Sequence, residues 1–332
     1  MGFLENLKKR QQEAGTLREE KRQKKLGHPV WVIKCPAPDH ERKVKWGDYS
    51  FAKALKKYLE RLGAYVVIDL HEHWEDAHAA DVVLVLRGLY AYEPKQKLKN
   101  CRYYMWNISH PDMISDQEYE WYDHVFIGSA HYAHELEKRL SVPVSVLQQC
   151  TDAEIFTPEG EHYAPCEGAY LFIGNSRGVV RNSVLWSINA GVSPYIVGGG
   201  WKKIIPKHMD LVREQSVEND LIPAYYRAAK VTMNDHWDDM LQLQFVNNRI
   251  FDAVACGLPV ITDVCDELRE IFPTGLLYYE NEEEFRACVR EIEENYEEVK
   301  AKTLALRPLV CEKYSFAARA EELMQIYKRE TE

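Results

Sequence analysis

The hydrophobic positions from Pro29 onward follow two alternating patterns. Short apolar runs rich in Val, Ile and Tyr are separated by longer stretches in which apolar residues recur at helical spacing. This alternation is typical of parallel sheets that are covered by helices on both faces. In the first half it predicts strands at Val30–Cys35, Ala64–Leu70, Asp81–Arg87, Cys101–Ile108, His124–Ser129 and Val144–Leu147, with helices such as Ser50–Leu62 and Ala130–Leu140 between them.

A second series begins after a polar stretch, residues 151–168, that Pro and Gly punctuate. Its predicted strands are Ala169–Ile173, Pro194–Val197, Lys230–Asn234, Pro259–Thr262 and Leu276–Tyr279. Helices are expected at Val180–Ala190, Pro223–Ala229, Gln242–Cys256 and Glu282–Tyr296, and a last helix at Phe316–Lys328.

The two series predict an α/β chain of two Rossmann-like domains that face an interdomain cleft. We place the N-terminal domain at 29–155, a linker at 156–168 and the C-terminal domain at 169–315, and we expect the helix within 316–332 to pack back on the N-terminal domain. The length of 332 residues suits two domains. Because ligands of open parallel sheets bind outside the carboxyl ends of the strands, the informative residues should follow strands.

The first 28 residues read as a charged helical extension. Residues 1–25 contain eight Lys and Arg and four Glu, a net charge of +4. Because the whole chain has a net charge of −10, the remaining residues carry −14. Phe3, Leu4 and Leu7 form only a short apolar stripe. A solvated helix is therefore the preferred interpretation, and a weak peripheral contact with a membrane surface is the alternative.

Composition narrows the function classes. The acidic body, with a pI near 5.7, disfavours a nucleic acid polymer as partner. The eight cysteines are scattered without a C-x-x-C pair, which favours reduced thiols in the cytoplasm over disulfides or a zinc site. No run of signal-peptide type or of membrane-spanning length appears, so we expect a cytoplasmic protein.

The first candidate ligand site follows the strand Ala169–Ile173. Gly174 and Asn175 open a small-residue turn before a helix, and Arg177 and Arg181 come directly after it. Backbone N–H groups at a helix N-terminus and guanidinium groups both bind phosphate oxygens, so this segment predicts a diphosphate site. The alternative is a glycine turn with two surface arginines. No G-x-G-x-x-G fingerprint is present, which argues against a nicotinamide dehydrogenase.

Further candidates follow later strands. Gly200 and Trp201 end a glycine run where a base or sugar would fit, or where the tryptophan fills the core. Asp235 and His236 follow Lys230–Asn234, and the histidine suits proton transfer or phosphate binding. We expect the carboxylates of this segment to be solvated, since too few ligands are present for a metal.

The helix before the strand Pro259–Thr262 carries a third group. Asn248, Arg249 and Asp252 lie on adjoining turns, and Asp252 interrupts an apolar face. A carboxylate there can accept both hydroxyls of a ribose, as the acidic residue of dinucleotide folds does. The alternative is a surface pair between Asp252 and Arg249 at i, i+3 spacing.

These motifs together carry a resemblance to a known family. The stretch N-R-I-F-D-A-V-A-C-G-L-P-V-I-T from Asn248 resembles the donor helix of GT-B glycosyltransferases. With the segments Gly174–Arg181, Asn234–Met240 and His110–Asp112, the chain resembles the spore-maturation CgeB type, related to glycosyltransferase family 4. The resemblance implies a nucleotide-sugar donor in the C-terminal domain, an acceptor in the N-terminal domain, and no cofactor or divalent metal.

Residue by residue, the resemblance implies that Gly174, Asn175 and Arg177 contact the donor phosphates and that Asp252 contacts the ribose, with Asn248 and Arg249 facing the same pocket. Family 4 enzymes carry a Glu eight residues before the ribose carboxylate, where this chain has Gln244. The contacts to the donor sugar and the stereochemical outcome are therefore left open.

Two residues of the N-terminal half are the candidate catalytic groups. Asp48 lies in a segment that resembles the glycine-containing loop facing the cleft in these enzymes. It would accept the proton of an acceptor hydroxyl, or else cap the following helix. His110 follows the strand Cys101–Ile108 and suits acid–base or electrostatic work, or else is a turn histidine.

The predicted function is glycosyl transfer from a nucleotide-diphosphate sugar to a glycan or protein acceptor. A nucleotide-sugar 2-epimerase of the same fold is one alternative. A non-enzymatic, two-lobed small-molecule binding protein is the other.

Overall fold

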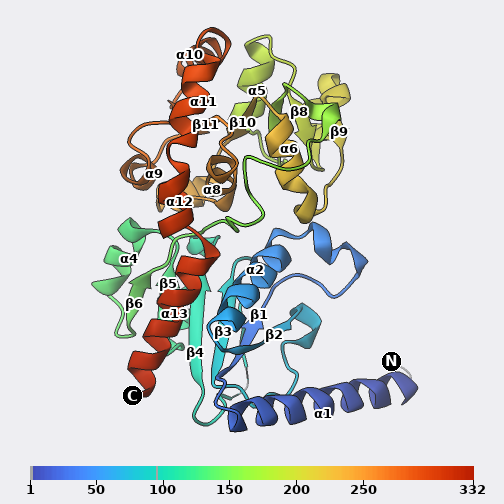
Figure 1. Ribbon diagram of the computed structural model, residues 1–332, viewed down its shortest axis with the longest axis vertical. Helices are drawn as coiled ribbons and strands as arrows, with labels where there is room; N and C mark the ends of the chain where they lie inside the picture. Colours follow the sequence, from blue (N-terminus) through green and yellow to red (C-terminus); the bar gives the residue numbers. More distant parts are fainter. Residues whose placement is uncertain (1–2, 95) are drawn as a thin grey trace. The chain divides into compact units, whose positions relative to one another are not determined.

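The computed structural model describes residues 3–94 and 96–332, and side chains from residue 11 onward (Figure 1). The predicted apolar stripe of Phe3, Leu4 and Leu7 therefore lies outside the described side chains. The chain forms two compact units. The N-terminal unit comprises the residues up to Leu147 together with Arg319–Glu332, and the C-terminal unit is Gln148–Ala318.

The N-terminal unit is built on a six-stranded parallel sheet in the order β2-β1-β3-β4-β5-β6. Its strands are β1 (Val30–Lys34), β2 (Tyr65–Asp69), β3 (Val82–Arg87), β4 (Arg102–Asn107), β5 (His124–Ile127) and β6 (Val144–Val146). Every residue of β1, β3 and β5 is buried, as parallel strands covered on both faces require. The strand order reverses between β1 and β3, which makes their carboxyl ends the switch point of this sheet.

Two helices cover one face of this sheet. Phe51 of α2 (Gly47–Arg61) packs edge-on against Trp106, with ring centroids 4.9 Å apart. Tyr327 of α13 (Phe316–Thr331) packs in the same way against Trp31, whose ring also contacts Tyr104. Because Tyr104 and Trp106 are two residues apart on β4, they point to one face, and both helices lie there (Figure 1).

The long helix α1 (Phe3–Lys25) is anchored at its C-terminal end. Glu20 is fully buried and accepts hydrogen bonds from the backbone N–H of Ala79 at 2.6 Å and from His78 at 2.5 Å. The remaining elements of the unit are α3 (Asp116–Glu120), α4 (Ala130–Glu137) and the short 3-10 helices η1 (Glu41–Lys45), η2 (His71–His73) and η3 (Pro111–Met113).

The C-terminal unit is a second six-stranded parallel sheet, in the order β12-β11-β10-β7-β8-β9. Its strands are β7 (Tyr170–Ile173), β8 (Tyr195–Val197), β9 (Val212–Glu214), β10 (Val231–Asn234), β11 (Val260–Asp263) and β12 (Leu277–Tyr279). Successive strand residues join different core clusters, Leu171 one and Phe172 the other, so the sheet is buried on both faces. Its switch point lies between β7 and β10.

The α-helices of this unit are α5 (Asn182–Asn189), α6 (Ile222–Ala228), α7 (Asp238–Gln242), α8 (Asn248–Ala255), α9 (Asp266–Ile271), α10 (Glu282–Glu294), α11 (Tyr296–Leu304) and α12 (Arg307–Lys313). Its 3-10 helices are η4 (Ala164–Cys166), η5 (Trp201–Lys203), η6 (Pro206–Leu211) and η7 (Asn219–Leu221).

The sheets confirm the predicted fold class, but several elements of the C-terminal unit differ from expectation. The helices α9, α11 and α12 were not predicted. Strand β9 was not predicted, because three residues of which none is buried leave no apolar run. The helix expected at Gln242–Cys256 is interrupted: α7 ends at Gln242, Gln244 has a φ of 63°, and α8 begins at Asn248. The segment expected as a linker, 156–168, belongs to the C-terminal unit.

Over the described part of the chain, none of the helices is long and apolar enough to cross a membrane.

Candidate functional site

Two glycine-containing turns interlock at the switch point of the C-terminal sheet. The Gly174 N–H donates to Val197 O at 2.8 Å, and the side chain of Asn175 accepts from Gly199 N–H at 2.7 Å. Gly198, with a φ of 145°, leaves no room for a side chain, because a Cβ there would lie 2.1 Å from Gly174 O. The structure therefore brings the predicted Gly174, Asn175 and Gly200 segments together.

Arg181 and Asp235 form a buried ion pair beside these turns. The Arg181 Nε donates to Asp235 Oδ1 at 2.5 Å, and its Nη2 donates to the backbone O of Asp235 at 2.9 Å. Asp235 Oδ2 also accepts from Ser183 Oγ at 2.7 Å, in the first turn of α5. Asp235 is only 5% exposed, so the expectation of a solvated carboxylate was wrong at this position, and Arg181 is not a surface residue.

Three guanidinium groups gather at this edge of the sheet. Arg249 donates to Ile173 O at 3.2 Å and lies beside Gly174. Burial, together with the nearby positive charges of Arg181 and Arg177, lowers the pKa of Arg249 to about 10. Arg177 is exposed, and its guanidinium lies over the ring of Trp237. The arrangement concentrates positive charge where the strands β7 and β10 end.

Trp201 does not line this site. Its side chain is 1% exposed and packs edge-on against Phe172, with ring centroids 5.5 Å apart. The prediction that it contacts a base is wrong for this structure, and the alternative, a tryptophan that fills the core, is what the structure contains. Only the backbone of the Gly198–Gly200 turn faces the Gly174 turn.

His236 is held by a partner that the sequence did not indicate. Its Nδ1 lies 2.6 Å from Asp263 Oδ1, and its backbone N–H donates to Asp263 Oδ2 at 2.7 Å. The Nε2 accepts from Asn247 N–H at 3.4 Å, so Nδ1 carries the proton toward the carboxylate. Asp263 is the last residue of β11, and its position at a strand end was the one available signal.

Asp252 lies in the interior of the unit on α8. It is 5% exposed and accepts from Asn248 Nδ2 at 3.0 Å, one helical turn earlier. Burial raises the pKa of Asp252 to about 8, although the hydrogen bond from Asn248 acts against this rise. The Arg249 guanidinium donates to the backbone carbonyls of Ile173 and Asp235, so the i, i+3 surface pair with Asp252 is not formed. Gln149, which sequence reasoning missed, accepts from Asn248 N–H at 2.8 Å.

In the N-terminal unit, the two candidate catalytic residues approach the same glycine. A Cβ on Gly88 would lie 3.8 Å from Asp48 Oδ1 and 3.1 Å from Ser109 Oγ, which in turn lies 3.0 Å from His110 Nδ1. Asp48 sits in the first turn of α2, whose N-cap is Trp46, so it is not the helix cap considered above. The cluster occupies the strand ends at the switch point of this sheet.

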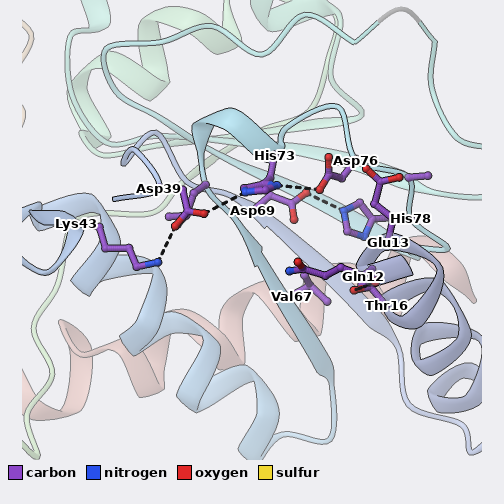
Figure 2. A pocket seen from close by; sticks show the side chains of 12 residues that line it. Gln12, Glu13, Thr16, Asp39, Lys43, Val67, Asp69, His73, Asp76 and His78 are labelled. Carbon is purple, nitrogen blue, oxygen red and sulfur yellow. Dashed lines mark hydrogen bonds and ion pairs between the residues drawn. The ribbon is translucent and has the colours of Figure 1, made fainter. Parts of the chain in front are cut away.

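A separate polar cavity of about 210 Å³ lies between α1 and the loops after β1 and β2 (Figure 2). His73 bridges Asp39 and Asp76 at 3.1 and 2.9 Å, and His78 lies 2.8 Å from Asp69 (Figure 2). Burial acts to lower the pKa of both histidines, but the carboxylates outweigh it and raise them, that of His78 to about 9. Within residues 3–94 and 96–332, no group of His, Cys, Asp and Glu is arranged to hold a metal ion.

The geometry agrees with comparisons to known proteins. Residues 183–325 match the glycosyl transferase-like family. The fold is similar to sucrose-phosphate synthase from Thermosynechococcus elongatus, at 14% identity over 91% of this chain and 98% of that chain, with a TM-score of 0.68. The fold is also similar to a glycosyltransferase from Rickettsia africae, at 12% identity over 91% of this chain and 98% of that chain, with a TM-score of 0.61.

HepE from Anabaena, solved with UDP and glucose, gives 9% identity over 91% of this chain and 100% of that chain, with a TM-score of 0.61. Among curated proteins, no sequence matches. The shared architecture of both units gives the chain the GT-B fold, and residues 183–325 of its C-terminal unit are similar to the glycosyl transferase-like family.

Proposed function

We propose that this enzyme transfers a sugar from a nucleotide-diphosphate sugar to a glycan or protein acceptor, and that it is of the CgeB type related to family 4. One observation carries the donor assignment: Arg177, Arg181 and Arg249 surround the Gly174 turn at the switch point of the C-terminal sheet. Guanidinium groups and backbone N–H groups at such a point suit a diphosphate. The HepE complex with UDP and glucose makes UDP-glucose the first donor to test.

The chemistry follows from charge. As the bond between the anomeric carbon and the diphosphate breaks, negative charge grows on the leaving group. The guanidinium of Arg177 would stabilise this charge more in the transition state than in the ground state, whereas the N–H groups of Gly174 and Ser176 already donate to Val197 O and Gly199 O. We propose that these arginines supply the charge that a divalent metal would otherwise provide, so that transfer needs none.

Asp252 would accept hydrogen bonds from the ribose hydroxyls, assisted by Asn248 at 3.0 Å. On the acceptor side, Asp48 would take the proton of the attacking hydroxyl. His110, at the same strand ends, would act as an acid or base or stabilise charge electrostatically. The free thiols of all eight cysteines support a reducing, cytoplasmic setting. A weak membrane contact through the N-terminal helix remains a prediction.

Nucleotide-dependent stabilisation tests the donor assignment. A ligand at 100 times its dissociation constant adds about 2.7 kcal/mol to stability, so UDP, GDP or dTDP should raise the melting temperature while NAD should not. Labelled UDP-glucose with a panel of glycan and peptide acceptors then identifies products. A released epimerised donor without acceptor would favour the 2-epimerase, and binding of simple solutes alone would favour the two-lobed binding protein.

A further inference from the structure

The indole of Trp237 faces two of the three arginines. The Cζ of Arg177 lies 4.6 Å from the ring centroid, and the Cζ of Arg181 lies 5.2 Å from it. Both arginines belong to the segment that follows β7, whereas Trp237 follows β10 on the neighbouring strand. The ring therefore connects the two sides of the switch point.

The two arginines are held in different ways. Arg181 is 5% exposed and fixed by the carboxylate and backbone O of Asp235. Arg177 is exposed on a left-handed backbone, with a φ of 53°. Its side chain has many rotamers in solution, and fixing them costs entropy unless a contact offsets it.

An indole ring is well suited to hold a cation at a phosphate site. The negative face of the ring attracts a guanidinium, yet the ring adds no negative charge that would repel an approaching phosphate. A carboxylate in the same place would attract Arg177 more strongly and would repel the diphosphate. The three guanidiniums repel one another, and this repulsion adds to burial in lowering the pKa of Arg249. The negative face of the ring offsets part of the repulsion.

We propose that Trp237 is a positioning residue that holds Arg177 ready for the diphosphate of the donor. This role rests on the proposed function, because it concerns the same site. Trp237 does not bind the diphosphate itself. It orients the guanidinium of Arg177, which binds the diphosphate.

The test measures the dissociation constant of UDP by titration calorimetry for Trp237→Leu and Trp237→Phe. Leu keeps apolar bulk but has no aromatic face, so UDP binding should weaken roughly 3- to 30-fold, the range of cation–π contacts. Phe retains a face and should restore most of the affinity. Trp186→Leu is the matched control, since Trp186 is also half-buried in this unit but packs on Tyr279 and Phe285.

A double-mutant cycle separates positioning from general damage. In an Arg177→Ala background, Trp237→Leu should cause a much smaller further loss of UDP affinity, because only the contact of the ring with Arg181, which Asp235 already holds, remains. An undiminished loss in that background, or an unchanged affinity in Trp237→Leu alone, would overturn the role of Trp237. If the wild-type protein binds none of UDP, GDP and dTDP, the proposed function itself is wrong and this role is lost with it.

Discussion

Arg181 and Asp235 form a buried ion pair in which Arg181 Nε lies 2.5 Å from Asp235 Oδ1. The pair connects the segment after β7, which carries Arg181, with the carboxyl end of β10, which Asp235 follows. The pair fixes the position of the Arg181 guanidinium within the arginine cluster. Asp235 Oδ2 also accepts from the Ser183 hydroxyl, so the same carboxylate is bound to the first turn of α5.

Asp235→Asn should destabilise the protein by about 3–5 kcal/mol, because it leaves the buried charge of Arg181 without its counter-ion. Urea denaturation measures the change. Asp238→Asn, an exposed neighbour, is the control and should stay close to wild type. A loss below about 1 kcal/mol for Asp235→Asn, the value of an exposed pair, would contradict the assignment.

Arg177→Ala should slow sugar transfer by roughly tens to thousands of fold, the range for groups that stabilise developing charge. Because Arg177 is exposed, the melting temperature should change little. Steady-state kinetics with UDP-glucose provide the measurement, and the exposed Arg290→Ala is the matched arginine control. Turnover equal to wild type in Arg177→Ala would remove this residue from the site.

The burial that raises the pKa of Asp252 to about 8 gives stability a pH dependence. An unfolded Asp titrates near pH 4, so between about pH 4 and 8 the folded protein holds a proton that the unfolded chain has lost. The free energy of unfolding should therefore fall as pH rises through this window and level off above it. Asp252→Asn should abolish this contribution, on the order of a few kcal/mol. Denaturation from pH 5 to 9 tests it, with the exposed Asp266→Asn retaining the slope.

Gly198→Ala should be far more damaging than Gly191→Ala. Both glycines have positive φ, of 145° and 81°, but a Cβ on Gly198 would meet Gly174 O at 2.1 Å whereas one on Gly191 meets nothing within 4 Å. Strain alone costs about 1–2 kcal/mol in either variant, and Gly198→Ala adds a displacement of the Gly174 turn. Melting temperatures and UDP affinity compare the two. Equal effects would show that the turns are not interlocked in solution.

Docking of α1 should weaken at alkaline pH. Burial acts to lower the pKa of His78, but Asp69 and Glu20 raise it to about 9, with Lys34 on the other side of Asp69. The stabilisation is complete below the unfolded histidine pKa near 6.5 and is lost as pH rises through about 9. Hydrogen exchange of residues 11–25, corrected for intrinsic rates, should accelerate between pH 7 and 10. In His78→Gln the exchange should be fast at both values, whereas Glu19→Gln should behave as wild type.

Local patterns located the strands well because buried parallel strands produce continuous apolar runs, as at Val82–Arg87. They failed where the apolar pattern of a helix continues although the backbone leaves the helical conformation, as in the helix expected at Gln242–Cys256. Phe245 and Val246 are fully buried and continue the helical rhythm, yet Gln244 adopts a left-handed backbone that ends the helix. No local pattern distinguishes that case.

The site residues show the same limit. Positions directly after strands identified Gly174 and Asp235, and a charged residue on an otherwise apolar helix face identified Asp252. Their partners were not accessible, because Asp263 meets His236 and Gln149 meets Asn248 only through tertiary packing. Charge on Asp235 also suggested exposure, and only the structure shows that Arg181 compensates its burial.

The division of α13 between the two units has a consequence for synthesis. The C-terminal unit is one uninterrupted segment, whereas the N-terminal unit needs residues 319–332 to cover Trp31 and to supply Glu330 to Tyr104 and His124. On the ribosome, the C-terminal unit can therefore complete its fold while the N-terminal unit still exposes an aromatic surface. The half that is translated first is the last to be finished, and a nascent chain that stalls before residue 319 would present that surface to chaperones.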